Sequence, residues 1–230
     1  MLTEVSRRRH VTLKLFIHPE SLGPRVDHEL SMHHRISTAT KWHPGRSSVR
    51  ELLDSFEVTE PDGCHHCLVH PPLWESVLTF LRRNPVERLP AVVLHRLFLA
   101  LDYLHTECKI IHTDIKADNI MFGIEDDTVF TAFEEQVLAE PSPRKLVKGD
   151  RAIYVSRELR MPKEWGAPVL CDFESAMLGD VEHCEDVQPD VYRAPEVILE
   201  ILWSYEIDIW NVGCMVSTEN GNGLVQELTK

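Results

Sequence analysis

Side chains that could act on phosphate groups gather in three parts of the chain. Asp114, Lys116 and Asn119 lie in the segment HTDIKADN, Asp172 follows the apolar run APVLC, and Lys14 lies near the start. Phosphoryl transfer asks a protein mainly to position the reactants and to neutralise charge. A lysine for phosphates, oxygen ligands for a metal ion and a carboxylate beside an acceptor hydroxyl are sufficient for that chemistry.

Four motifs around these residues follow the order known from one family. They are HTDIKADN at 112–119, Asp172-Phe173, YRAPE at 192–196 and DIWNVG at 208–213. HTDIKADN has the kinase catalytic-loop spacing H-x-D-x-x-x-x-N, with threonine where arginine is usual. Upstream, VTLK at 11–14 stands where the V-A-I-K strand is expected, and Glu29 lies on the next predicted helix.

Over roughly residues 10–215 the chain therefore resembles eukaryotic protein kinases. The wording HTDIKADNIMF, the long insert behind it and the short activation segment resemble the SR-protein-kinase-like, fungal-type branch. This resemblance implies a serine/threonine protein kinase that uses ATP and Mg²⁺. Lys14, paired with Glu29, would bind the α- and β-phosphates, and Asn119 with Asp172 would hold the metal ion.

The same resemblance implies that Asp114 orients the acceptor hydroxyl and that Lys116 contacts the γ-phosphate. His112 and Asp208 would be structural. Thr113 has no cation to pair with a phosphorylated activation loop, so we expect any activity to be constitutive.

Acidic residues dominate the segment that faces the peptide in kinases. These residues are Asp180, Glu182, Glu185, Asp186 and Asp190. They predict a basic, Arg/Ser-rich protein substrate, and the alternative is a solvated acidic loop. The whole chain has 37 acidic and 24 basic side chains, a formal charge of −13, which argues against nucleic acid or an anionic membrane as a direct partner.

Two departures from the family pattern weigh against catalysis. Residues 1–9 contain no glycine, so the expected glycine-rich loop is missing ahead of the VTLK strand. Glu174 replaces the glycine of the D-F-G motif, and we expect backbone strain and charge repulsion there. A second hypothesis is therefore a catalytically impaired pseudokinase, or a truncated gene product, that acts by binding a protein.

The end of the sequence also differs from the family, because nothing after Val216 resembles the later helices of a kinase. The helix that starts near Asp208 would then lack partners. We expect its apolar face, formed by Ile209, Val212 and Met215, to be exposed.

The elements predict an α+β, two-lobed kinase-like fold in which both the strand-rich N-lobe and the mainly helical C-lobe are truncated. Residues 1–70 form the N-lobe, with strands near 10–17, 49–58 and 65–73 around one helix. Residues 71–230 form the C-lobe, with helices from Trp74 and after Pro90. Leu94, Leu97, Leu101 and Leu104 form its core stripe. A surface insert without clear periodicity occupies about 124–166.

Cysteine usage favours a reducing compartment, so we expect a nuclear or cytoplasmic protein. The six cysteines are scattered, and no signal peptide or membrane span is apparent. Cys64, His65, His66 and Cys67 have the chemistry of zinc ligands. They stand without a second pair at finger spacing, in a segment where a kinase strand is expected.

Overall fold

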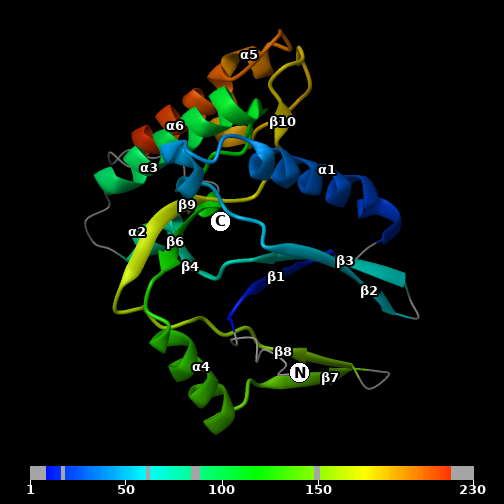
Figure 1. Ribbon diagram of the computed structural model, residues 1–230, viewed down its shortest axis with the longest axis vertical. Helices are drawn as coiled ribbons and strands as arrows, with labels where there is room; N and C mark the ends of the chain where they lie inside the picture. Colours follow the sequence, from blue (N-terminus) through cyan, green and yellow to red (C-terminus); the bar gives the residue numbers. More distant parts are fainter. Residues whose placement is uncertain (1–8, 17–18, 61–62, 84–88, 148–150, 219–230) are drawn as a thin grey trace, which may run out of the picture.

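Apolar residues in the first part build a three-stranded antiparallel sheet in the order β1-β3-β2, with one helix on it. The computed structural model describes residues 9–16, 19–60, 63–83, 89–147 and 151–218 (Figure 1). The sheet and helix are β1 (Thr12–Leu15), α1 (Pro19–Thr38), β2 (Asp54–Glu60) and β3 (Gly63–His70). Phe16, Val26 and Leu68 form a small core between α1 and the sheet.

The predicted strand, helix and two further strands are all present in this part. Residues 61–62, between the last two strands, lie outside the described residues, as do the segments 1–8 and 219–230. The division into lobes near residue 70 stays a prediction.

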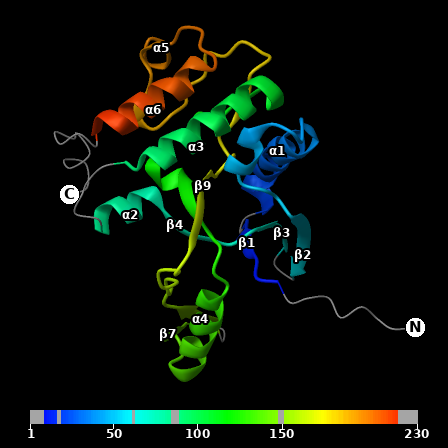
Figure 2. The ribbon, with the colours of Figure 1, turned by 60° about the vertical axis from the view of Figure 1, so that its left-hand side comes forward.

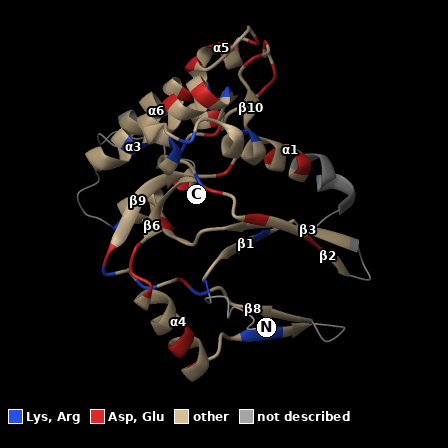
Figure 3. Ribbon diagram, in the orientation of Figure 1, with Lys and Arg blue, Asp and Glu red and all other residues tan. Residues whose placement is uncertain are grey.

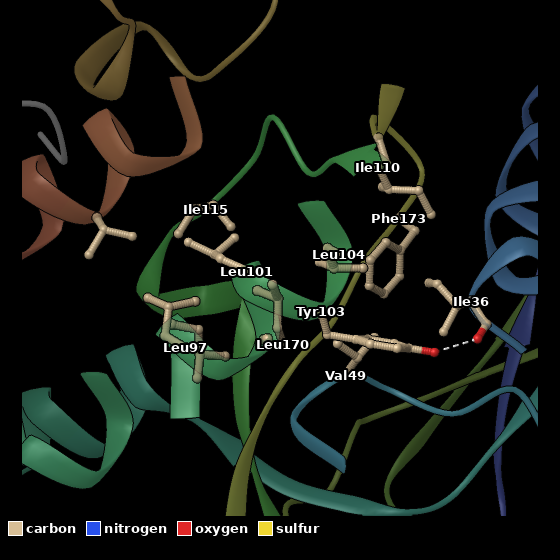
Figure 4. Close-up of a cluster of buried hydrophobic side chains, with 14 of the residues drawn as sticks. Ile36, Val49, Leu97, Leu101, Tyr103, Leu104, Ile110, Ile115, Leu170 and Phe173 are labelled. Carbon is tan, nitrogen blue, oxygen red and sulfur yellow. Dashed lines mark hydrogen bonds between the residues drawn. The ribbon is translucent and has the colours of Figure 1, made fainter. Parts of the chain in front are cut away.

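The leucine stripe predicted for the core forms the helix α3 (Ala91–Asp102), which continues as a wider helical turn over Tyr103–Cys108. Leu97, Leu101 and Leu104 are buried in the main core, and Leu94 packs at its edge. Figure 4 shows Leu104 beside the ring of Phe173. Ile36 belongs to the same core cluster, so the core joins α3 and its continuation to α1 and to the segment after β9.

A tight contact fixes the loop that follows α1 against α3. The short helix η1 (Pro44–Ser48) contains Gly45, and a Cβ atom there would lie 1.8 Å from the Leu99 carbonyl oxygen. Only glycine allows this approach. The Tyr103 hydroxyl donates a hydrogen bond of 2.7 Å to the Ile36 carbonyl, which ties the helical turn after α3 to α1 (Figure 4).

A second antiparallel sheet, in the order β4-β6-β9, brings the catalytic-loop motif beside the Asp-Phe motif. Its strands are β4 (Leu73–Ser76), β6 (Ile120–Ile124) and β9 (Trp165–Leu170). The helix predicted from Trp74 begins later, as α2 (Val77–Arg83), because residues 73–76 pair with β6 as a strand.

The insert contains more regular structure than its weak periodicity predicted. It forms α4 (Thr128–Ala139) and a hairpin of β7 (Arg144–Val147) with β8 (Arg151–Tyr154). Figures 1 and 2 both place α4 and the hairpin at the end of the molecule away from α5 and α6. Val129 and Phe130 are buried, and the Phe130 ring stacks on the His10 ring with 4.4 Å between centroids, so the insert packs against the chain two residues before β1.

The last described part packs against α3. It contains β10 (Met177–Leu178), which pairs with the earlier strand β5 (Ile110–Ile111), then η4 (Asp190–Tyr192), α5 (Pro195–Ile198) and α6 (Glu206–Thr218).

The prediction that one whole face of α6 is exposed was wrong. Val212 and Met215 are buried in the main core, because α6 packs on the elements that precede it. Ile209 is half exposed, and Trp210 beside it is too. No described helix is both long and apolar enough to cross a membrane.

Candidate active site

Three elements bring Lys14, Glu29 and Asp172 together. Lys14 on β1 donates from Nζ to both carboxylate oxygens of Glu29 on α1, at 3.0 and 2.8 Å. The same ammonium donates to Asp172 Oδ1 at 3.2 Å, just beyond β9. The three residues are separated by up to 158 positions in the chain, so their contact is a product of the fold.

The electrostatics of this cluster favour a charged lysine. Burial alone would lower the pKa of Lys14, but the hydrogen bond and charge of Glu29, with Asp172, raise it above its ordinary value. Burial raises the pKa of Asp172, yet the charge and hydrogen bond of Lys14 outweigh this and lower it. Burial also raises the pKa of Glu29, which is 2% exposed.

The second half of the site is the loop between β5 and η3 (Ala117–Asn119). Asp114 accepts hydrogen bonds from Lys116 Nζ at 3.0 and 2.7 Å and from Asn119 Nδ2 at 2.8 Å. Asn119 Nδ2 also donates to the Asp114 carbonyl at 2.9 Å, so the amide is held by its nitrogen. A hollow of about 320 Å³ lies beside Asp114.

Strand pairing joins the two halves. Ile120 opens β6 and pairs with Leu170, the last residue of the antiparallel β9, so the residues just outside this pair are neighbours. Cys171 donates from its backbone nitrogen to the Asn119 carbonyl at 2.8 Å, and its own carbonyl lies 3.0 Å from His112 Nε2. Asp172 is therefore anchored to the catalytic loop through its neighbour Cys171.

A buried aspartate braces the loop from below. Asp208 on α6 accepts hydrogen bonds from the backbone nitrogens of His112 and Thr113, both at 2.8 Å, and lies 2.8 Å from His105 Nε2. Thr113 has a φ of 66°, an uncommon conformation that these hydrogen bonds hold in place. Its buried hydroxyl donates a hydrogen bond of 2.8 Å to the Ser175 carbonyl, which ties the loop directly to the activation segment, the stretch that runs from Asp172 to Glu196.

The structure corrects the strain expected at Glu174. The residue with positive φ in this motif is Asp172, at 70°, and Glu174 has no such φ. Glu174 lies in a turn closed by a 3.2 Å hydrogen bond from the Ala176 nitrogen to the Phe173 carbonyl, where a glycine is not required. The expected charge repulsion has a basis, because Glu174 contributes to the raised pKa of Glu29, after the larger effect of burial.

The donor set around Asp172 suits a hard divalent cation. Carboxylate oxygens of Glu29, Asp172 and Glu174 lie within 4.8 Å of one another, and this is the one such group of ligand atoms in the described parts of the chain. The Asn119 amide is held by its nitrogen, and its role as a metal ligand stays a prediction. Oxygen donors of this kind are those that Mg²⁺ selects.

The other candidate metal ligands lie on β3. Cys64 Sγ is 3.3 Å from Glu57 Oε2, and His66 Nδ1 is 3.5 Å from the second oxygen of the same carboxylate. Glu57 thus bridges the two side chains across the β2–β3 hairpin.

Most of the acidic segment expected to face a substrate is bonded within the chain. Asp180 pairs with Arg35 at 3.0 Å, and Glu185 lies 3.2 Å from His183. Asp186 and Asp190 share Arg193, at 3.3 and 2.9 Å. Glu182 is exposed, and no ion pair to it is found in the described residues. The acidic segment therefore presents less unpaired negative charge than its composition predicted.

Sequence reasoning gave no role at the site to His33 and His28, which link α1 to the segment after β9. His33, one turn after Glu29 on α1, packs edge-on against the Phe173 ring at 5.4 Å. His28 Nε2 lies 2.6 Å from the Ala176 carbonyl. The i, i+4 spacing of Glu29 and His33 places both on one face of a helix, and this was the available signal.

Comparison with solved structures defines the class of fold. The crystal structure of the kinase domain of PF14_0431 superposes with a TM-score of 0.64 and 20% sequence identity, covering 94% of this chain and 57% of that one. The fold is that of a protein kinase domain, as the α+β, two-lobed prediction required. No family model matches the chain.

Curated relatives place the chain within that class. A serine/threonine protein kinase of Aspergillus fumigatus is 40% identical over 220 residues, which are 93% of this chain and 51% of the relative. The serine/threonine-protein kinase SRPK of Physarum polycephalum is 29% identical, covering 94% of this chain and 55% of that protein. SRSF protein kinase 3 of Homo sapiens is 28% identical over 63% of this chain and 27% of its own length.

The chain belongs to the eukaryotic protein kinase family, and its relatives include SR-protein kinases. It spans about half the length of the first relatives it matches.

Proposed function

We propose that this protein is a serine/threonine protein kinase that transfers the γ-phosphate of ATP to Arg/Ser-rich proteins. The observation that carries the proposal is the double contact of Lys14, which bonds at once to Glu29 and to Asp172. A lysine held in this way presents its charge where phosphates would lie, beside a carboxylate that suits a metal ion.

Each residue then has a task. Lys14 binds and orients the α- and β-phosphates, while Asp172 and Asn119 hold Mg²⁺, which when bound neutralises charge on the phosphates. Asp114 accepts a hydrogen bond from the acceptor hydroxyl and positions it for in-line attack. Lys116 pairs with Asp114 in this structure and would contact the γ-phosphate of an incoming nucleotide.

The preference for Arg/Ser-rich substrates is supported by the names of two relatives, SRPK and SRSF protein kinase 3. It is also supported by the chain's charge of −13 and by the exposed carboxylates of Glu182, Asp186 and Asp190. Asp186 lines the hollow at Asp114, and Asp190 pairs with Arg193, which lines it too. Asp186 and Asp190 can exchange Arg193 for a substrate arginine, because both carboxylates are mostly exposed.

A second candidate is a pseudokinase that binds protein without transferring phosphate. Glu174 favours it, because this third carboxylate lies within 4.8 Å of Glu29 and Asp172 and adds negative charge where nucleotide phosphates would approach.

Phosphate incorporation separates the two candidates. Folded protein is incubated with radiolabelled Mg·ATP and an Arg-Ser repeat peptide, with a Lys-Ser peptide and an Arg-Ala peptide as controls. The kinase proposal predicts labelling of the Arg-Ser peptide and a loss of at least a hundredfold in Asp114→Ala. No labelling of any peptide by folded protein would leave the pseudokinase, and equal labelling of Lys-Ser would remove the substrate preference.

A further inference from the structure

A cavity beside the end of α1 is lined by cations although the protein as a whole is acidic. It has a volume of about 530 Å³ and lies between the end of α1, the loop 41–52 and the start of β4. Three basic side chains line it, those of Lys41, Arg46 and Arg50, and Glu51 is the acidic side chain among its lining residues. Figure 3 shows blue segments on the loop that follows α1, in a chain whose formal charge is −13.

These cations are not neutralised by the protein. None of the three forms an ion pair with a carboxylate in the described part of the chain. Arg46 donates from Nη1 to the Ile36 carbonyl and to the Tyr103 hydroxyl, both at 3.0 Å, so its guanidinium is held in place by neutral groups. Arg50 Nε is buried and has no hydrogen-bond partner.

A buried donor without a partner costs folding free energy unless something supplies an acceptor. Arg50 is half buried, and its charge contributes to the lowered pKa of His33, which also lines the cavity, after the larger effects of burial, His70 and Lys14. An anion in the cavity would give Arg50 Nε an acceptor and would offset this positive charge.

The interior of the cavity is apolar. Ile36, Val49, Leu73 and Val169 line it, with Pro71 at one side. Its volume falls in the range that small-molecule sites occupy, about 300 to 1,000 Å³. A fully hydrated ion such as free phosphate would leave this apolar surface unused, whereas a ligand with an apolar body would cover it.

We propose that this cavity is a binding site for a small organic anion, a phosphate, sulfonate or carboxylate group on an aromatic or aliphatic body. The anionic group lies against Lys41 and Arg50, and the apolar body packs on Val49, Leu73 and Val169. The site is separate from the cluster of Lys14, Glu29 and Asp172 and does not depend on phosphoryl transfer.

The cavity is connected to Asp172 through short contacts. The backbone nitrogen of Arg50 donates a hydrogen bond of 2.9 Å to the carbonyl of Leu170, which lies two residues before Asp172. His33 lies between the cavity and the Phe173 ring. A ligand that orders the loop 41–52 therefore bears on the backbone that positions Asp172.

Phenyl phosphate serves as the probe, with benzyl alcohol as its neutral counterpart and inorganic phosphate as the anion without an apolar body. Isothermal titration calorimetry should show saturable binding of phenyl phosphate, with a dissociation constant on the order of 1 mM for so small a fragment. The two partial ligands should bind at least tenfold more weakly.

Variants locate the binding. Lys41→Glu, at the exposed rim, and Ser37→Phe, which fills the cavity from exposed α1, should each weaken phenyl phosphate at least tenfold. Lys145→Glu on β7 is the matched charge reversal outside the cavity and should leave the affinity unchanged, as should Lys14→Met. Circular dichroism establishes that each variant is folded.

The proposal is overturned by folded wild-type protein that does not bind phenyl phosphate saturably at 10 mM, roughly ten times the expected constant. It is also overturned by binding that survives Lys41→Glu and Ser37→Phe, or that disappears in Lys14→Met, because the ligand would then occupy another place. None of these results bears on whether the protein phosphorylates a peptide.

Discussion

Replacing His33 with leucine should make the stability of the protein less sensitive to acid. His33 is 3% exposed, and its pKa is lowered to about 3, first by burial and then by the charges of His70, Lys14 and Arg50, while Asp172 acts in the opposite direction. Its ordinary pKa is 6.5. Below pH 6.5 the unfolded chain therefore binds a proton that the folded protein excludes.

The magnitude follows from this difference. Stability that depends on a neutral His33 is fully present above pH 6.5 and is lost as the pH falls toward its folded pKa. Each pH unit in that interval costs about 1.4 kcal/mol, so the free energy of unfolding falls by about 2 kcal/mol from this one residue between pH 7 and pH 5. His70, with a pKa lowered to about 4, mainly by burial, contributes in the same direction.

Urea unfolding at pH 7 and pH 5 measures the effect. We expect the loss of stability between the two pH values to be about 2 kcal/mol smaller in His33→Leu than in the wild type, whatever the absolute stability of the variant. His34→Leu, which replaces an exposed histidine on the same helix, is the matched control and should leave the loss unchanged. An equal loss in His33→Leu and wild type would refute the inference that His33 is buried and neutral.

Three further changes test other parts of the structure. Asp208→Asn should lower the free energy of unfolding by about 3 kcal/mol in urea titrations, because an amide nitrogen would face a backbone N–H that the carboxylate now accepts from. A change below about 0.5 kcal/mol would contradict the stabilising role of these two hydrogen bonds. Tyr103→Phe should cost about 1 kcal/mol by the same measurement, since the Ile36 carbonyl and Arg46 lose a partner, and a neutral result would count against that contact. Glu174→Gln should tighten Mg·ATP binding about fivefold in calorimetry, because it removes a negative charge from the place where the nucleotide phosphates would approach. Weaker binding would instead make Glu174 a favourable metal ligand.

The sequence was most informative where local pattern and chemistry agree. The leucine spacing predicted the buried face of α3, and the strand, helix and two strands of the first part follow from their apolar periodicity. The motif order indicated which residues to compare, and Lys14, Glu29 and Asp172 do lie in contact. Their roles remain predictions.

Other features depend on tertiary contacts that no local pattern encodes. In the insert, α4 is stabilised in part by the stacking of Phe130 on His10, which lies more than 100 residues earlier in the chain. Val212 and Met215 are buried by α3 and its neighbours, and the sequence of α6 alone does not show these partners. The backbone at Glu174 is not strained, because the residue of this motif with a left-handed conformation is Asp172. Glu174 lies instead in a turn closed by a hydrogen bond from the Ala176 nitrogen to the Phe173 carbonyl.

The most direct test is calorimetric titration of the folded protein with Mg·ATP, in wild type, Lys14→Met and Asp172→Asn, with Arg82→Gln on α2 as a surface control. A common nucleotide and metal site built by Lys14, Glu29 and Asp172 predicts measurable wild-type binding that depends on Mg²⁺ and weakens at least tenfold in both site variants but not in the control. Wild-type affinity retained in Lys14→Met and Asp172→Asn, or binding indifferent to EDTA, would contradict it.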